Sequence, residues 1–266
     1  MLLVAGAMVS VSGSAAAHEP IFGLGPHTIY QGGVGLEVEA ARESAGEERI
    51  RALHTEILYG VTPDLSITAS VPLLRKEEGK RSRAGLGDTV FRAKWRFWRR
   101  DALGTQKQLA LVAGVKLPTG DNAGPVRLGS GSVDFLAVFT GGYESRRWYS
   151  FGDVGIRINT EANGIRRGNR FFADVAGGIR PWLTGYWEPD LVLLVEANLE
   201  HERRTRVKGA LQEDTGGTVV AFSPGLLLSY RNVMFKAGVQ FPVLQRLNGD
   251  QERRGPFYAV AVEWHL

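Results

Sequence analysis

The chain has 266 residues, of which 44% are hydrophobic and 23% are charged, with a formal net charge of +4 and no cysteine. It contains no run of about 18 apolar residues after its first segment, which excludes a helical membrane protein. The mean hydropathy of −0.11 does not exclude a membrane β-barrel, because only alternate residues of its strands face lipid.

The first 17 residues carry no charge and have an apolar core that continues to Val11. They end in Ala15-Ala16-Ala17, small residues that suit a signal-peptide cleavage site after Ala17. The sequence therefore predicts a signal peptide over 1–17, a periplasmic N-terminal segment over 18–32 and a barrel over 33–266. Export also argues against nucleic acid as a partner, despite the basic net charge.

Apolar and polar residues alternate along about twelve segments of about ten residues each, with no helical segment between them. The segments are 33–43, 51–59, 65–72, 88–97, 107–117, 132–143, 147–159, 170–180, 190–200, 218–230, 232–241 and the run that ends at Leu266. In 218–230 the alternation is broken by Pro224, which predicts a bulge or bend. The pattern predicts an all-β fold, a closed antiparallel transmembrane β-barrel of about twelve strands.

Short and long connections alternate along the chain. Short turns fall at 60–64, 144–147 and 230–232, and longer polar connections fall near 42–50, 73–87, 118–131, 159–169, 201–217 and 242–255. Outer-membrane barrels have short periplasmic turns and longer external loops. This pattern predicts a protein of the outer membrane of a Gram-negative envelope, with lipid around it and both termini in the periplasm.

One face of the predicted strands carries charges of both signs, and these side chains are predicted to line the lumen. They are Glu37, Glu39, His54, Glu56, Arg92, Lys94, Arg96, Lys116, Asp134, Asp153, Arg157, Asp174, Arg180, Glu196, Lys236 and Glu263. Charges inside a barrel must be hydrated or paired, since an isolated buried ion costs several kcal/mol. Two interpretations follow: a narrow charge-lined passage, or a ladder of ion pairs that fills the lumen.

The residues show no arrangement of nucleophile, base and acid, so we expect neither an enzyme nor a cofactor. His18 would become the N-terminal residue after cleavage and would offer an amine and an imidazole together. Together with His27 it is a candidate ligand for copper or zinc. The alternative is a flexible periplasmic tail.

Three glycine-containing motifs lie at strand ends: Gly85-Leu86-Gly87-Asp88, Lys116-Leu117-Pro118-Thr119-Gly120-Asp121 and Gly129-Ser130-Gly131-Ser132-Val133-Asp134-Phe135. Together with the turn Tyr59-Gly60-Val61-Thr62-Pro63-Asp64-Leu65, they resemble the outer-membrane proteins grouped under the MetA-pathway of phenol degradation. The resemblance covers roughly residues 30–266. It implies an outer-membrane barrel that passes small compounds, often aromatic or hydrophobic.

The predicted function is a porin-like channel or transporter that passes small solutes by passive diffusion. The alternative is a non-conducting structural or metal-handling barrel of the envelope. The last run, Tyr258 to Leu266, is predicted to be the strand that the barrel assembly machinery recognises. Leu266 stands where outer-membrane barrels typically end in Phe, and it keeps the apolar character of that position.

Overall fold

The computed structural model describes residues 19–185 and 188–266, and the predicted signal peptide lies outside these residues. The strands are β1 (Val34–Ala45), β2 (Glu48–Thr62), β3 (Leu65–Glu78), β4 (Arg81–Leu86), β5 (Thr89–Ala102), β6 (Thr105–Leu117), β7 (Asp134–Ser145), β8 (Trp148–Ile158), β9 (Glu161–Ala162), β10 (Ile165–Arg166), β11 (Arg170–Ile179), β12 (Asp190–Glu202), β13 (Arg206–Val207), β14 (Ala210–Leu211), β15 (Gly217–Tyr230), β16 (Val233–Leu247) and β17 (Phe257–His265). Within the described ranges, no helix is long and apolar enough to cross a membrane.

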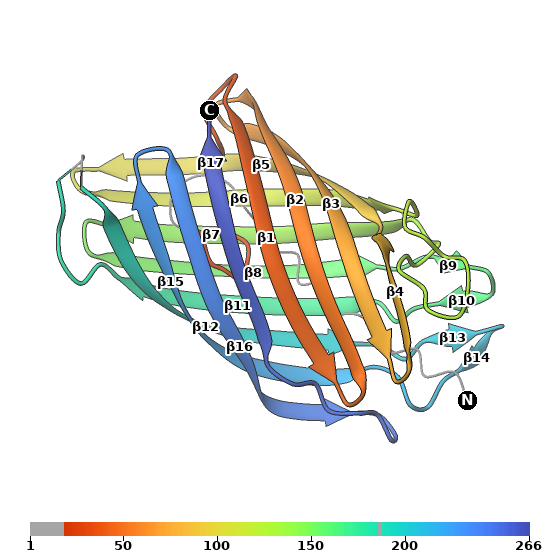
Figure 1. Cartoon of the computed structure of the whole chain (residues 1–266). Helices are drawn as coiled ribbons and strands as arrows, with labels where there is room; N and C mark the ends of the chain where they lie inside the picture. The colour runs from red at the N-terminus through yellow and green to blue at the C-terminus, as the bar shows by residue number, and fades with distance from the viewer. Residues whose placement is uncertain (1–18, 186–187) are drawn as a thin grey trace.

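Twelve of the strands in the described part of the chain form one closed antiparallel barrel (Figure 1). They pair in the order β1, β2, β3, β5, β6, β7, β8, β11, β12, β15, β16 and β17. The barrel closes where β17 pairs with β1, with Leu36 opposite Trp264 and Val38 opposite Val262. The predicted fold class and the place of the final strand are confirmed.

The alternation along each strand separates an apolar outer face from an inner face. In β1, Leu36 and Val38 are exposed, whereas Glu37 and Glu39 are buried. The same pattern leaves many large apolar side chains on the outside, among them Ile57, Phe91, Leu111, Ile156, Val195 and Val260. Exposed apolar residues on almost every strand form the surface that a transmembrane barrel presents to lipid.

Several strands extend beyond the ranges that alternation predicts. β2 and β3 are joined to their neighbours by tight turns, so the long connections expected near 42–50 and 73–87 are instead strand hairpins. Two further hairpins, β9–β10 and β13–β14, pair with each other in a small separate sheet. Charged residues are frequent in these extensions, and the extensions have no apolar face. For this reason they do not show the alternation of apolar and polar residues that predicts a strand.

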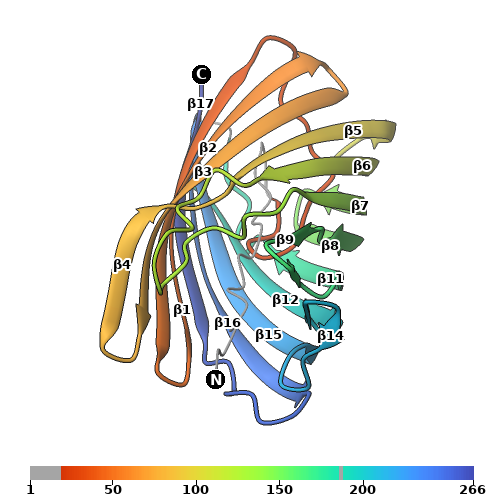
Figure 2. The same ribbon diagram turned by 90° about the vertical axis from the view of Figure 1, so that its right-hand side faces the viewer.

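Strand β3 pairs with two different strands along its length. Its first half, Leu65–Ser70, pairs with β5, and its second half, Leu73–Glu78, pairs with β4. Gly87 and Asp88 separate β4 from β5, and the Gly87 amide donates to the Pro72 carbonyl oxygen at 2.8 Å. Figure 2 shows β4 following the end of β3 while β5 runs away from it. The segment between β6 and β7 crosses to this break.

Candidate functional site

The segment that precedes β1 lies inside the barrel. Residues 19–29 are all buried, and Glu19 has no exposed surface. Residues 19–29 of the predicted N-terminal segment 18–32 are thus held in the lumen by buried groups of the barrel wall, and the periplasmic location of the segment stays a prediction. His18 lies outside the described residues.

The carboxylate of Glu196, on β12, receives the backbone of this segment. Its Oε1 accepts from the Ile21 amide at 2.6 Å, and its Oε2 accepts from the amides of Phe22 at 3.1 Å and Gly23 at 3.0 Å. Hydrogen bonds to a charged group each contribute about 1.5–3 kcal/mol. One buried carboxylate thus satisfies three consecutive backbone amides that the segment cannot pair within itself.

Further polar contacts hold the segment on either side of Glu196. The Leu24 amide donates to Oδ2 of Asp153 at 2.7 Å, and the Leu24 carbonyl oxygen accepts from the Thr140 hydroxyl at 2.5 Å. Nζ of Lys94 lies 2.6 Å from Oε1 of Glu19. These contacts come from β5, β7 and β8, so together with Glu196 on β12 four strands of the wall hold the segment.

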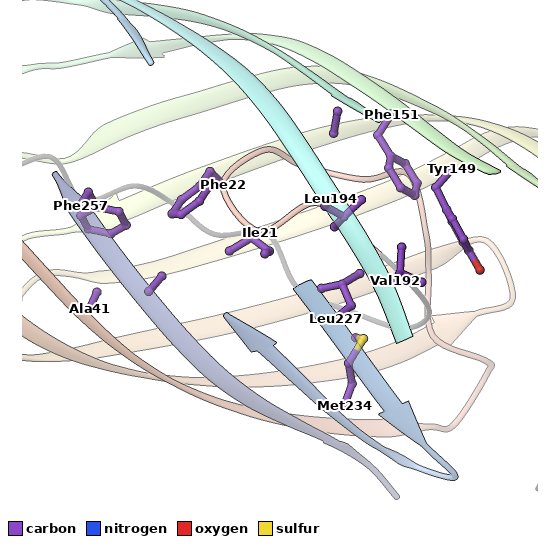
Figure 3. Close-up of a cluster of buried hydrophobic side chains, with 12 residues drawn as sticks. Ile21, Phe22, Ala41, Tyr149, Phe151, Val192, Leu194, Leu227, Met234 and Phe257 are labelled. Carbon is purple, nitrogen blue, oxygen red and sulfur yellow. The ribbon is translucent and has the colours of Figure 1, made fainter. Parts of the chain in front are cut away.

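Apolar packing also holds the segment in the lumen. Ile21 and Phe22 lie among inward-facing side chains of the wall (Figure 3). The cluster includes Tyr149, Phe151, Val192, Leu194, Leu227, Met234 and Phe257. Burying a large apolar side chain contributes roughly 1.5–3 kcal/mol. We call residues 19–29 the plug.

Two cavities border the inner face of the wall, and the smaller of them also borders the plug. The larger has a volume of about 130 Å³ and is bordered by charged groups such as Glu39, Glu56 and Arg157 together with apolar groups such as Leu74 and Phe257. The smaller, of about 80 Å³, is bordered by Phe22 and Leu24 of the plug and also by Arg157. Arg157 borders both cavities, whose walls are partly apolar and partly ionic.

The residues predicted to line the lumen lie on the inner side of the wall. Buried are Glu37, Glu39, Glu56, Arg92, Lys94, Arg96, Asp134, Asp153, Glu196, Lys236 and Glu263, and half-buried are His54, Lys116, Arg157, Asp174 and Arg180. Arg180 stands just beyond β11 and binds Asp190 there, at the end with the short turns. Which of them contact a solute stays a prediction.

Several of these charges are paired with one another, and others pair with carboxylates outside this set. Arg92 binds Glu56, and Lys236 binds both Glu37 and Glu263, the latter at 3.1 Å. Arg96, the third member of the basic row on β5, binds the side chain of Asp64 at 2.8 Å. This part of the interior agrees with the ion-pair ladder. A charge-lined passage, which is the other interpretation, would have to run through the two cavities.

The three glycine-containing motifs meet at the break between β4 and β5. Oδ1 of Asp88 accepts from the Gly120 amide at 3.0 Å, and Oδ2 accepts from the Ser130 amide at 2.7 Å and hydroxyl at 2.6 Å. Lys116 binds Asp134 and lies 3.5 Å from Asp88. Asp88 thus fixes both ends of the loop whose Leu128 and Gly129 border the larger cavity.

Replacing Asp88 with Ala is expected to release residues 119–130 and to lower the free energy of unfolding by about 4 kcal/mol or more, since three hydrogen bonds to a carboxylate are lost. Urea unfolding of the refolded barrel measures the loss, and protease cleavage within 119–130 measures the release. Asp101→Ala is the matched control, because Asp101 is exposed at the opposite end of β5. Equal stability of the two variants would contradict this role of Asp88.

Replacing Glu196 with Ala is expected to weaken the plug without removing it. Three buried amides would lose their acceptor, at about 1–3 kcal/mol for each unsatisfied group, so the segment should leave the lumen about a hundredfold or more often. Protease cleavage within residues 19–29 of the refolded protein measures it. Glu37→Gln is the control: Lys236 keeps Glu263, and Glu37 has no hydrogen bond to the plug. A cleavage rate within 19–29 that stays at the wild-type value in E196A would rule out the anchor.

His27 lies inside the barrel, where its Nε2 is 2.6 Å from Oε1 of Glu144 and its ring packs on Phe151. Among the described residues, no group of three or more His, Asp or Glu is placed to hold a metal. His27 is therefore a plug residue with an ionic partner in the wall.

The apolar half of the site is not among the residues predicted from the sequence, although the sequence contains a signal for it. Residues 191–195 and 225–228 are almost continuously apolar instead of alternating. A continuous apolar run indicates a strand that is buried on both faces. Val192, Leu194 and Leu227 are the inward members of these runs, and they face the plug.

A closed antiparallel barrel with an apolar outer surface and a charged interior defines a transmembrane β-barrel of the outer-membrane type. The chain belongs to the family described as "Putative MetA-pathway of phenol degradation", whose model matches residues 57–251. This confirms the family that the glycine-containing motifs indicate.

Solved structures share the fold at low sequence identity. The chain is similar to the COG4313 outer membrane channel from Pseudomonas putida F1, with a TM-score of 0.75, 11% identity and coverage of 91% of this chain and 98% of that one. It is also similar to the NanC porin (TM-score 0.53, 8% identity, 87% and 100% covered) and to the β domain of the Bordetella autotransporter BrkA (TM-score 0.51, 11% identity, 89% and 100% covered). A comparison with curated proteins found no relative.

Proposed function

We propose that the protein is an outer-membrane channel that passes small solutes, aromatic and hydrophobic compounds among them, by passive diffusion. The observation that carries this proposal is a closed barrel whose lumen holds a non-covalent plug and two cavities. A plug held by hydrogen bonds, by the contacts of Glu19 with Lys94 and of His27 with Glu144, and by apolar packing can leave its site, whereas a lumen filled by wall side chains alone cannot open.

The chemistry of the larger cavity supports small solutes of mixed character. Its apolar wall, which includes Leu74, Val90 and Phe257, suits a hydrocarbon or aromatic body, and its charged groups suit a polar substituent. Two of the similar structures are an outer membrane channel and a porin. Diffusion down a gradient requires no cofactor.

The proposal includes an orientation, with both termini on the periplasmic side. The Leu266 amide donates to the Val34 carbonyl oxygen at 2.8 Å, so the two ends of the barrel sequence meet at one rim. The short turns after β2, β5, β7 and β15 lie at this rim, and the long connection between β6 and β7 lies at the other. Periplasmic turns are the short ones in such barrels.

Liposome swelling with refolded protein tests the proposal, using a panel of aromatic, fatty and metal-complexed solutes of similar size. We expect solute-dependent swelling that is fastest for small aromatic compounds. Absence of swelling for every solute, both with the wild type and with a variant lacking the plug, would favour the alternative of a non-conducting structural or metal-handling barrel.

The final strand is proposed as the segment that the barrel assembly machinery recognises. Tyr258, Val260, Val262 and Trp264 alternate outward on β17, next to β1. Deleting Trp264 to Leu266 is expected to reduce the amount of protein in the outer membrane severalfold, while molecules that do insert conduct as the wild type does. Normal accumulation of the truncated protein in isolated outer membranes would contradict this proposal.

A further inference from the structure

Three exposed arginines form one row across the first three strands. Arg42 of β1 lies opposite Arg51 of β2, and Arg51 lies opposite Arg75 of β3. All three side chains are exposed and are in register with outward-facing positions. We call these three residues the arginine row.

The arginine row borders the lipid-facing surface. The neighbouring outward row, one step toward the short-turn rim, consists of Ala40, Leu53 and Leu73, and the next consists of Val38, Thr55 and Val71. On the other side of Arg42, β17 places Tyr258 in the same row, with its side chain exposed. Tyrosine and arginine beside an apolar band mark the level of the lipid headgroups.

The positive charge of the arginine row is not balanced by carboxylates of the described residues. Like charges directly opposite on neighbouring strands destabilise a sheet, and here two such pairs stand side by side. Arg75 has one carboxylate partner, with its Nε 3.1 Å from Oε1 of Glu77. Arg42 and Arg51 have no ion pair with any residue in 19–185 or 188–266. An external anion between them would remove the repulsion.

We infer that the arginine row binds the phosphate of a lipid headgroup, of the kind that lipid A carries in the outer leaflet. The site faces outward, so its ligand must lie beside the barrel and not in the lumen. The guanidinium group binds phosphate through two parallel hydrogen bonds, and two neighbouring arginines can share one phosphate. The inference uses the orientation given above and is independent of which solute the barrel passes.

The test is a titration of the whole refolded protein in detergent with diphosphoryl lipid A, followed by native mass spectrometry. We expect the double variant Arg42→Gln/Arg51→Gln to bind lipid A about thirtyfold more weakly than the wild type, since a basic residue near an anionic surface contributes about fivefold. Lys80→Gln/Arg81→Gln is the matched control, because it removes the same charge at the same rim but outside the arginine row. Heat-modified gel migration verifies that each variant is folded.

The outcomes separate the possible sources of binding. Equal weakening in the control variant would indicate adsorption through net charge and would overturn the inference. Equal binding of dephosphorylated lipid A would show that phosphate is not the group recognised. Inorganic pyrophosphate that bound as tightly as lipid A would make this a site for free phosphate and would overturn its assignment to a lipid. None of these results bears on solute passage.

Discussion

Deleting residues 19–29 is expected to turn a barrel that is closed for most of the time into one with a steady conductance that is severalfold larger. The deletion removes the contacts of Ile21 and Phe22 with the wall, and all other residues of the apolar cluster that these two join belong to wall strands. A barrel of twelve strands is wider than the eight-stranded barrels that wall side chains can fill. Its lumen should therefore remain open without the plug.

Single-channel recording and liposome swelling of the deletion variant measure this effect. The control is a full-length variant in which Ile21 and Phe22 are replaced by Ser. It loses the apolar packing of the plug and keeps the backbone contacts to Glu196. We expect its conductance to lie between those of the wild type and the deletion variant. A deletion variant that folds and conducts no better than the wild type would show that the wall itself closes the lumen.

The outer face of the barrel could be predicted because lipid imposes one chemical requirement on it. The row Phe91, Ala93 and Trp95 alternates with Arg92 and Lys94, and β5 has that register in the structure. Every strand that crosses the membrane must repeat this pattern. The number of barrel strands and the position of β17 followed from the same requirement.

The interior could be predicted only in part, because the lumen has no single solvent. An inward charge such as Glu196 is compatible with water, with an ion pair or with a buried backbone, and alternation does not distinguish among them. Its partners, the amides of Ile21 and Gly23, lie more than 170 residues away in the chain. Pairing over such a separation leaves no local pattern.

The amino-acid composition of the plug, considered together with the structure, fits an irregular buried segment. Pro20, Gly23, Gly25 and Pro26 prevent regular secondary structure, and Ile21, Phe22 and Leu24 are more apolar than a free tail requires. On the wall, Gly225 and Gly238 face each other where Ile21 and Phe22 pack, and a side chain at either position would clash with the plug. Small residues on the inner face marked the space that the plug occupies.

A disulfide between the plug and the wall is expected to block solute passage reversibly. A Cβ atom placed on Gly23 would lie 3.2 Å from Cβ of Asp174, close to the 3.5–4.5 Å that a disulfide requires. The natural chain has no cysteine, so Gly23→Cys/Asp174→Cys can form only this bond within one molecule. If passage requires the plug to leave, the oxidised variant should show no swelling of liposomes and no channel openings, and dithiothreitol should restore both.

The control for this lock is the single variant Asp174→Cys, which loses the same carboxylate and the hydrogen bond from Asn198 but cannot form the bond. It should pass solutes equally under oxidising and reducing conditions. The comparison between the two variants isolates movement of the plug from any effect of the lumen charge, because both lack Asp174. Passage through the oxidised double variant at the rate of the reduced one, with the disulfide verified by mass spectrometry, would mean that solutes move past a stationary plug. The two cavities that share Arg157 would then be the route, and the gate would have to be sought in the loop that Asp88 holds.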